Sequence, residues 1–456
     1  MKTSIIIVFC SLISLLNAQL SISNSLTVSD TFGNSHPQID LTNNGIPLIT
    51  WTKFSTNSIY ISRFQNDQFL SPLKLNPDGL GVQTYNWSGP DLAIENSNVY
   101  VVFKAEGYET GKIYLVKSTD NGNTFSDTMR IDHLSEGYAQ YPDIAVLNDT
   151  IYTTFMQHDA MGMNPQYVLS RSFDGGLTFE NPILAGELLG DEACDCCPPE
   201  ITVNKDFVMI IFRNNASNIR DIKGVVSFDR GTTFTQIAEI DDNQWFLQAC
   251  PSSGPDSRIN SANILHTVFK SSLSSVPGVF MNAFDVNQNS SLATISISEG
   301  VNNPNYPQIS LNNDTIGVVF EGNGSGVDVY FNHSYSGING INQSSRINLS
   351  NITGAQSKPD IIFRNGTFHV VYADASKLTY VKLSESVGIN ELKNEKKLES
   401  ICISKSQNSN LDLKNYMIYS PLGNQIQASE ISTLAIGNYF LLDEKKQTIQ
   451  KLIIIP

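Results

Sequence analysis

The chain has 456 residues, a formal net charge of −15 and a pI of about 4.8. This acidic surplus argues against nucleic acid and against anionic membrane surfaces as partners, because both would repel the chain. The acidic residues are spread along the sequence, which favours a contribution to solubility.

The first 18 residues have the pattern of a secretory signal peptide. Lys2 is followed by an apolar run at residues 5–16, and Asn17 and Ala18 precede Gln19. The run is too short to span a membrane, and no later segment is a candidate for one. We therefore expect residues 1–18 to direct export.

A proline followed by Asp, Gln or Glu then recurs at a regular spacing. The seven prolines, 52 to 57 residues apart by subtraction, are Pro37, Pro90, Pro142, Pro199, Pro255, Pro307 and Pro359. Each is followed by short β-branched and aromatic runs separated by Asn, Asp and Gly, which predicts about four strands per period. Such a small sheet cannot bury both faces alone, and helical periodicity is missing. The sequence therefore predicts an all-β, seven-bladed β-propeller.

The turn motif Ser-x-Asp-x-Gly-x-Thr-Phe occurs at residues 118–125, 172–179 and 227–234. Asp120, Asp174 and Asp229 are expected to accept bonds from nearby backbone N–H groups, and the glycine supplies a positive φ. The motif resembles the Asp box of the sialidase-like (BNR-repeat) superfamily, where it is a structural turn. Enzymes of that superfamily have six blades, so six blades is the alternative.

The ends of the propeller are predicted from a mismatch in strand number. Residues 26–30 are predicted to form a strand that belongs to no repeat, and the seventh repeat shows only three strands. We therefore expect an N-terminal strand to complete the last blade and close the ring. The propeller is then 19–385, with a charged linker at 386–397.

The tail, 398–456, resembles the C-terminal sorting domain of the Bacteroidetes type IX secretion system, a small β-sandwich. Its residues 434–441 match the Leu-x-x-Gly-x-Tyr-Phe-Leu strand of that module. The resemblance implies the type IX machinery as a partner and a secreted protein or one on the bacterial outer surface, and we expect a monomer. A small binding module is the alternative.

In a propeller, the loop into each innermost strand and the loop after each second strand surround one central mouth. The sialidase mechanism needs three arginines on the sugar carboxylate, a tyrosine activated by a glutamate, and an aspartic acid. The mouth candidates for these roles are Arg213 and Arg220 for the anion, Tyr108 or Tyr141 as nucleophile, Glu106 or Glu109 as its base, and Asp159 or Asp221 as acid. Two arginines stand where three are expected, and an Arg220–Asp221 ion pair is the structural alternative.

Four cysteines fall in two of the connections into inner strands: Cys194, Cys196, Cys197 and Cys250. In an exported protein they predict disulfides, such as one between Cys250 and one of the other three. The alternatives are free thiols or a Cu(I) or zinc site, the only cofactor that the sequence suggests, with His158, Met161 and Met163 nearby. The segment resembles a branch of sialidase-family propellers that carries a Cys-x-Cys-Cys-Pro stretch.

These features favour a carbohydrate-directed propeller, and the resemblance implies a sialidase-like exo-glycosidase that acts on terminal acidic sugars. A non-catalytic propeller that binds glycans or proteins in adhesion is the first alternative, and a cysteine-lined metal protein is the second. The sequence leaves the sugar and its linkage open.

Overall fold

The computed structural model describes residues 19–386 apart from 86, 106, 108–110, 191, 274–275, 342–345, 351–353 and 375–376. Beyond residue 386 it describes five strands. The chain divides into two compact units, Met1–Ser386 and Val387–Pro456. The predicted signal peptide and linker lie outside the described residues.

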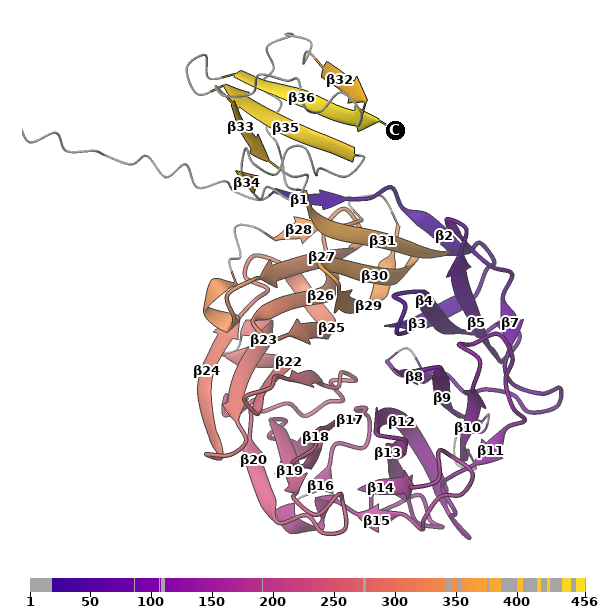
Figure 1. The fold of residues 1–456 in the computed structure, drawn as a ribbon. Coiled ribbons are helices and arrows are strands. Elements are labelled where there is room, and N and C mark those ends of the chain that lie inside the picture. The colour runs from indigo at the N-terminus through magenta and orange to yellow at the C-terminus, as the bar shows by residue number, and fades with distance from the viewer. Residues whose placement is uncertain are drawn as a thin grey trace, which may run out of the picture. The chain divides into compact units, whose positions relative to one another are not determined.

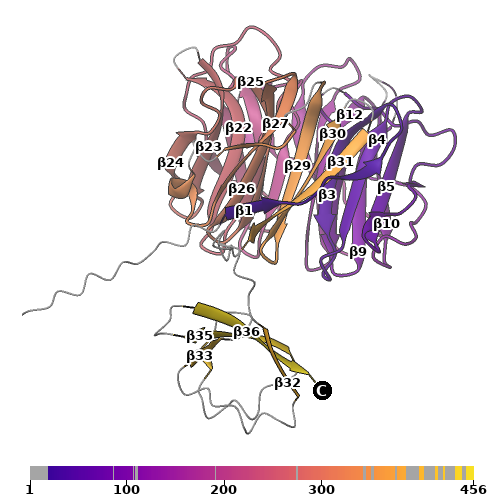
Figure 2. The same cartoon turned by 90° about the horizontal axis from the view of Figure 1, so that it is seen from above.

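The first unit is a ring of seven sheets, seen along its axis in Figure 1 and from the side in Figure 2. Blade 1 contains β3 (Asn34–Leu41), β4 (Pro47–Lys53), β5 (Ser58–Gln65), β6 (Gln68–Phe69) and β7 (Leu73–Lys74). Blade 2 contains β8 (Asp91–Glu95), β9 (Asn98–Lys104), β10 (Ile113–Ser118) and β11 (Met129–Arg130). Blade 3 contains β12 (Tyr138–Leu147), β13 (Thr150–His158), β14 (Gln166–Ser172) and β15 (Ile183–Leu184), and the 3₁₀ helix η1 (Gly186–Leu189) follows it.

The ring continues through four more blades. Blade 4 contains β16 (Glu192–Ala193), β17 (Glu200–Val203), β18 (Val208–Asn215), β19 (Ile222–Ser227) and β20 (Gln236–Glu239). Blade 5 contains β21 (Asp256–Ile259), β22 (Ile264–Leu273), β23 (Val276–Asp285) and β24 (Ser290–Ser296). Blade 6 contains β25 (Asn302–Asn312), β26 (Thr315–Asn323), β27 (Val327–Ser334), the 3₁₀ helix η2 (Ile338–Gly340) and β28 (Ile347–Asn348). Blade 7 contains β29 (Gln356–Arg364), β30 (Thr367–Asp374) and β31 (Lys377–Ser386).

The N-terminal segment completes blade 7. Both β1 (Gln19–Ile22) and β2 (Leu26–Ser29) pair antiparallel with β31, at opposite ends of that strand. The closure by an N-terminal strand is therefore confirmed, as is the count of seven blades, and the six-bladed alternative is wrong.

The hydrophobic core lies between blades rather than within them. Each of the seven interfaces holds one cluster of buried apolar side chains; Leu48 of blade 1 and Val99 of blade 2, for example, share a cluster. Because a single sheet has two apolar faces, the stacking of neighbours around the ring buries both of them.

The Asp-box turns close with the bonds that their residues predict. Asp120 accepts bonds from the backbone N–H of Thr124 at 2.9 Å and from its hydroxyl at 2.7 Å, and Asp174 and Asp229 repeat both contacts. Gly231 has a φ of 81°, and a Cβ there would lie 2.2 Å from Leu169 of the preceding blade. The turn needs glycine for its backbone and for blade packing alike.

The Asp of the Pro-Asp anchor has a structural role that the repeat alone did not reveal. The side chains of Asp91, Asp143, Asp256 and Asp360 each accept the backbone N–H of the residue two positions after the anchor proline of the next blade, at 2.5–3.1 Å. The last of these joins blade 7 to Ile39 of blade 1. The anchor therefore links neighbouring inner strands and holds the ring closed.

The second unit contains one five-stranded sheet among its described residues. The strands, in spatial order, are β32 (Ser400–Ser404), β36 (Thr448–Ile455), β35 (Gly437–Asp443), β33 (Tyr416–Tyr419) and β34 (Gln425–Ile426). Its first pair is parallel and the others are antiparallel. Nowhere in the described part of either unit is there a helix that could cross a membrane.

Candidate functional site

The inner strands of all seven blades surround a central cavity of about 460 Å³. Aromatic and basic side chains from four blades line it, namely His36, Trp87, Tyr306 and Lys358. Each of these residues stands one to three positions before an anchor proline, in the loops that the sequence placed around the mouth.

The backbone is strained directly before four of the anchor prolines. His36, Tyr141, Tyr306 and Lys358 directly precede anchor prolines and have φ values of 47° to 57°. At each of them the pairing register of the inner strand shifts, as at a β-bulge. A bulky residue before proline strongly disfavours this conformation, at about 1–3 kcal/mol each. Strain and bulges of this kind gather at functional sites, because they re-aim side chains.

Tyr306, Glu321 and Lys358 form a compact polar group at the mouth. The Lys358 ammonium lies 3.3 Å from the centre of the Tyr306 ring and 3.9 Å from the Glu321 carboxylate. Glu321 also accepts the backbone N–H of Lys358 at 3.0 Å, which links blades 6 and 7.

Burial shifts the protonation of this group. It lowers the pKa of Lys358 to about 8, against the opposing charge of Glu321. It also raises the pKa of Glu321, and burial together with that neighbouring carboxylate raises the pKa of Tyr306 to about 12. The group therefore combines a lysine that loses its proton more readily than usual, a tyrosine that stays protonated near neutral pH and a glutamate whose pKa is raised, which is an acid–base arrangement.

Blades 2 and 3 contribute an aromatic wall. The rings of Tyr85 and Trp87 stack at 5.3 Å, and Tyr141 lies 5.5 Å from Tyr85. Lys104 donates a 2.7 Å bond to the Tyr85 hydroxyl, and burial lowers the pKa of this lysine to about 8. Gly89, before the blade 2 anchor, has no room for a side chain, since a Cβ would lie 2.4 Å from that of His36.

Deeper in the cavity, acidic side chains surround Arg258. Its guanidinium contacts Asp256 at 2.7 Å and Glu200 at 3.0 Å, and 43% of its side chain stays open to the cavity. Burial acts to lower the pKa of Arg258, but the two carboxylates outweigh it and raise that pKa. Burial raises the pKa of Asp143, Glu200 and Asp256, and brings that of Asp360 to about 8.

The structure gives the predicted arginine pair other partners. Arg213 is fully buried, and its guanidinium donates to the carbonyls of Ser253, Arg220 and Lys270. Arg220 is buried and donates to the carbonyl of Leu247 and to the Cys194 sulfur. With these donors committed inside the protein, Arg213 and Arg220 do not present a grip for a sugar carboxylate.

The remaining predicted catalytic residues are not brought together. Asp221 accepts the backbone N–H groups of Gln244 and Trp245, and the described contacts include no Arg220–Asp221 ion pair. Asp159 orders its own loop by accepting bonds from Met161, Met163 and Asn164.

Only one of the predicted tyrosines can be placed. Tyr141 is buried, and its hydroxyl accepts a long 3.4 Å bond from the Trp87 indole. Glu106, Tyr108 and Glu109 lie outside the described residues.

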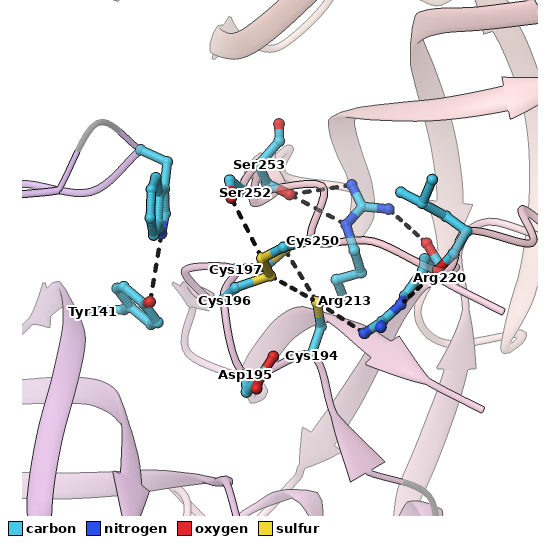
Figure 3. The surroundings of a disulfide bond; sticks show 12 residues. Tyr141, Cys194, Asp195, Cys196, Cys197, Arg213, Arg220, Cys250, Ser252 and Ser253 are labelled. Carbon is cyan, nitrogen blue, oxygen red and sulfur yellow. Dashed lines mark hydrogen bonds between the residues drawn. A yellow bond between two sulfur atoms is a disulfide. The ribbon is translucent and has the colours of Figure 1, made fainter. Parts of the chain in front are cut away.

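The four cysteines meet in the connections into the inner strands of blades 4 and 5 (Figure 3). Cys196 and Cys250 form a disulfide, as the sequence favoured, and Cys194 and Cys197 are buried free thiols. Among the described residues, Cys194, Cys196 and Cys197 form the one group of three or more side chains that could hold a metal ion. With Cys196 in a disulfide, two thiols remain as donors, and two guanidiniums near them oppose a cation. His158 contacts Gln140 instead, at 2.9 Å.

Sequence reasoning did not select Arg258 or the polar group of Tyr306, Glu321 and Lys358. The three residues of the polar group stand at mouth positions, but a single sequence shows neither the bulge nor the burial that shifts their pKa values. A signal was present in Tyr306 and Lys358, which are large residues directly before an anchor proline.

Comparison with solved structures supports the fold. The polysaccharide lyase Uly1 shares 9% sequence identity, and the match covers 80% of this chain and 99% of the lyase with a TM-score of 0.53. A protein of unknown function from Dyadobacter fermentans has 11% identity, coverage of 80% and 99%, and a TM-score of 0.47. The NanB sialidase of Streptococcus pneumoniae has 10% identity, coverage of 81% and 96%, and a TM-score of 0.46. No family model matches the sequence, and neither does any curated protein. The likeness to the lyase, whose TM-score exceeds 0.5, supports the fold alone at this identity.

Proposed function

We propose that this protein is a carbohydrate-directed propeller that takes an acidic sugar at the mouth of its central cavity. The observation that carries the proposal is the lining of one cavity by two aromatic rings, Trp87 and Tyr306, and the cation of Lys358. Aromatic faces stack on sugar rings, and a partly desolvated lysine is a strong partner for a carboxylate. Solved propellers with this fold include a polysaccharide lyase.

Cleavage of the sugar is the enzymatic form of this proposal. In it, Glu321, whose pKa is raised by burial, is the candidate general acid, Tyr306 is a hydrogen-bond donor to the leaving group, and Lys358 acts as base or as carboxylate partner. This differs from the sialidase-like scheme, which requires a tyrosine nucleophile. The raised pKa of Tyr306 keeps its hydroxyl protonated, so this residue donates a hydrogen bond and is not a nucleophile. The substrate remains a terminal acidic sugar such as sialic acid, with uronates as the neighbouring class.

Binding without turnover is the second candidate. It is favoured by the burial of Arg213 and Arg220, which removes the arginine grip of the sialidase mechanism. A panel of sialylated and uronate-bearing glycans tests both candidates. We expect a reducing sugar if the enzyme hydrolyses, an ultraviolet-absorbing unsaturated product if it eliminates, and binding alone if it is an adhesin. The absence of both binding and product across the acidic panel would contradict the proposal.

We also propose that the second unit directs export to the bacterial outer surface, as its resemblance to a type IX sorting domain implies. In a host with that secretion system, a chain truncated after Ser386 should accumulate inside the cell envelope, while the full chain reaches the surface or the medium. Equal surface delivery of both chains, measured by immunoblot of cell fractions, would contradict this.

A further inference from the structure

The four cysteines form an arrangement that neither the fold nor the proposed sugar site requires. The Cys194 sulfur lies 3.3 Å from that of Cys197 and 3.6 Å from that of Cys196. Cys196 is already bonded to Cys250, whose residue is exposed in the connection into blade 5. Two buried thiols therefore lie against the Cys196 sulfur of a disulfide (Figure 3), and the other half of that disulfide, Cys250, is exposed.

The surroundings of Cys194 favour a thiolate. Arg220 donates to the Cys194 sulfur at 3.4 Å, and the described contacts of Arg213 are with backbone carbonyls and the Trp245 ring. Asp221, which follows Arg220 in sequence, accepts hydrogen bonds from two backbone N–H groups.

The electrostatics follow from these contacts. The bond to Cys197 and the two guanidinium charges lower the pKa of Cys194 to about 7, although burial opposes them. Burial raises the pKa of Cys197, so this partner stays a thiol. A thiolate in contact with a disulfide is the reactant pair of thiol–disulfide exchange.

We propose that the four cysteines are a thiol–disulfide exchange site, in which Cys194 is the attacking sulfur, Cys250 is the exposed exchange point, and the substrate is an external disulfide. The Cys194 thiolate attacks the Cys196 sulfur, the Cys196–Cys250 bond breaks, and its electron pair leaves on Cys250. Cys197 then gives up its proton, which Cys250 gains by way of solvent, and attacks Cys194. A Cys194–Cys197 disulfide forms, and Cys196 leaves as a thiolate.

The internal transfer conserves one disulfide and two thiols, and needs no outside oxidant. Its product exposes a reduced Cys250. Cys250 returns its proton to solvent and, as a thiolate, attacks an external disulfide and releases one thiol, which takes up that proton. The Cys196 thiolate then displaces the second sulfur from Cys250, which is protonated from solvent. The net reaction oxidises the Cys194–Cys197 dithiol and reduces one external disulfide to two thiols.

The test uses the full chain with Cys10→Ser and Cys402→Ser, so that the four cysteines of the site remain. The probe is the disulfide 4,4′-dithiodipyridine, whose reduction releases two molecules of thiopyridone that are followed by their ultraviolet absorbance. We expect two equivalents without denaturant, and peptide mapping that finds Cys194–Cys197 and Cys196–Cys250 disulfides afterwards. Release only after denaturation would overturn the proposal. So would a stoichiometric zinc or copper ion whose removal is needed before the thiols react.

Two variants separate exchange from mere accessibility. Cys250→Ser should slow release of thiopyridone at least tenfold, because the buried dithiol loses its exposed relay. Arg220→Gln should slow it by about tenfold and shift the pH midpoint of the rate upward, because the thiolate loses its donor. The control Lys205→Gln, at an exposed lysine, should leave the rate unchanged. Equal rates in all three variants, with melting temperatures near that of the parent, would overturn the assignment.

Discussion

Two sets of acidic residues repeat with the blades, and they sit in opposite environments. Of the Asp-box residues, Asp174 and Asp229 are exposed and Asp120 is half-buried, and bonds from hydroxyl and N–H groups hold the pKa of Asp120 down at about 2. The inner-strand acids Asp40 and Asp360 accept similar backbone bonds, yet burial raises their pKa values to about 6 and about 8. The comparison shows that desolvation, more than hydrogen bonding, decides whether a repeated aspartate carries charge.

The largest expected effect is at the point where the ring closes. Asp360→Ala removes the acceptor of the Ile39 N–H, which joins blade 7 to blade 1, and of the Ile361 N–H. Two buried donors are then unsatisfied, so we expect the free energy of unfolding to fall by about 2–3 kcal/mol. Denaturant titration measures it, and Asp127→Ala, at an exposed aspartate, is the control. An Asp360→Ala chain as stable as this control would refute the role in closure.

The pH dependence of stability sharpens the same comparison. Asp40 and Asp360 titrate near 3.8 when unfolded and at about 6 and about 8 when folded, so folding favours their protonated forms. Their contribution is fully present below about pH 4 and is lost as the pH rises through those folded values. The difference in melting temperature between the parent and Asp360→Asn should therefore shrink from pH 5 to pH 9. A difference that grows over this range would contradict the account.

The Asp-box aspartates should show the reverse dependence and a smaller effect. Asp229 has a folded pKa of about 2: burial acts to raise it, but bonds from Thr233 and Ser227 outweigh burial. Its contribution is present above the unfolded value and is lost as the pH falls from about 4 to about 2. Because the side chain is exposed, we expect Asp229→Ala to cost only about 1 kcal/mol at pH 7. If Asp229→Ala lowered the free energy of unfolding as much as Asp360→Ala does, the distinction between the Asp-box and the inner-strand aspartates would be contradicted.

Much of the fold was predictable because it depends on a repeat. The proline anchors, the Asp boxes and the strand predicted at residues 26–30 are periodic features, and each maps onto a blade or its closure. Arg213 shows where this reasoning ends. Its position after a second strand predicted a mouth residue, but its guanidinium turns inward to carbonyls at Ser253 and Lys270, 40 and 57 residues away. Such long-range partners leave no local pattern.

The sequence predicted where the site lies, but it did not predict which residues form it. The rule that loops before the anchors surround the mouth located Tyr306 and Lys358 correctly. Their importance arises from a left-handed backbone and from burial beside Glu321, both of which are properties of the assembled ring.

The most direct test of the account is a calorimetric titration of the parent, Lys358→Met and Lys205→Met with a sialylated or uronate-bearing oligosaccharide and its neutral counterpart. The account predicts that the parent prefers the acidic sugar, that Lys358→Met loses at least tenfold in affinity for it, and that Lys205→Met matches the parent. Unchanged affinity for the acidic sugar in Lys358→Met would contradict the placement of the sugar at the central mouth.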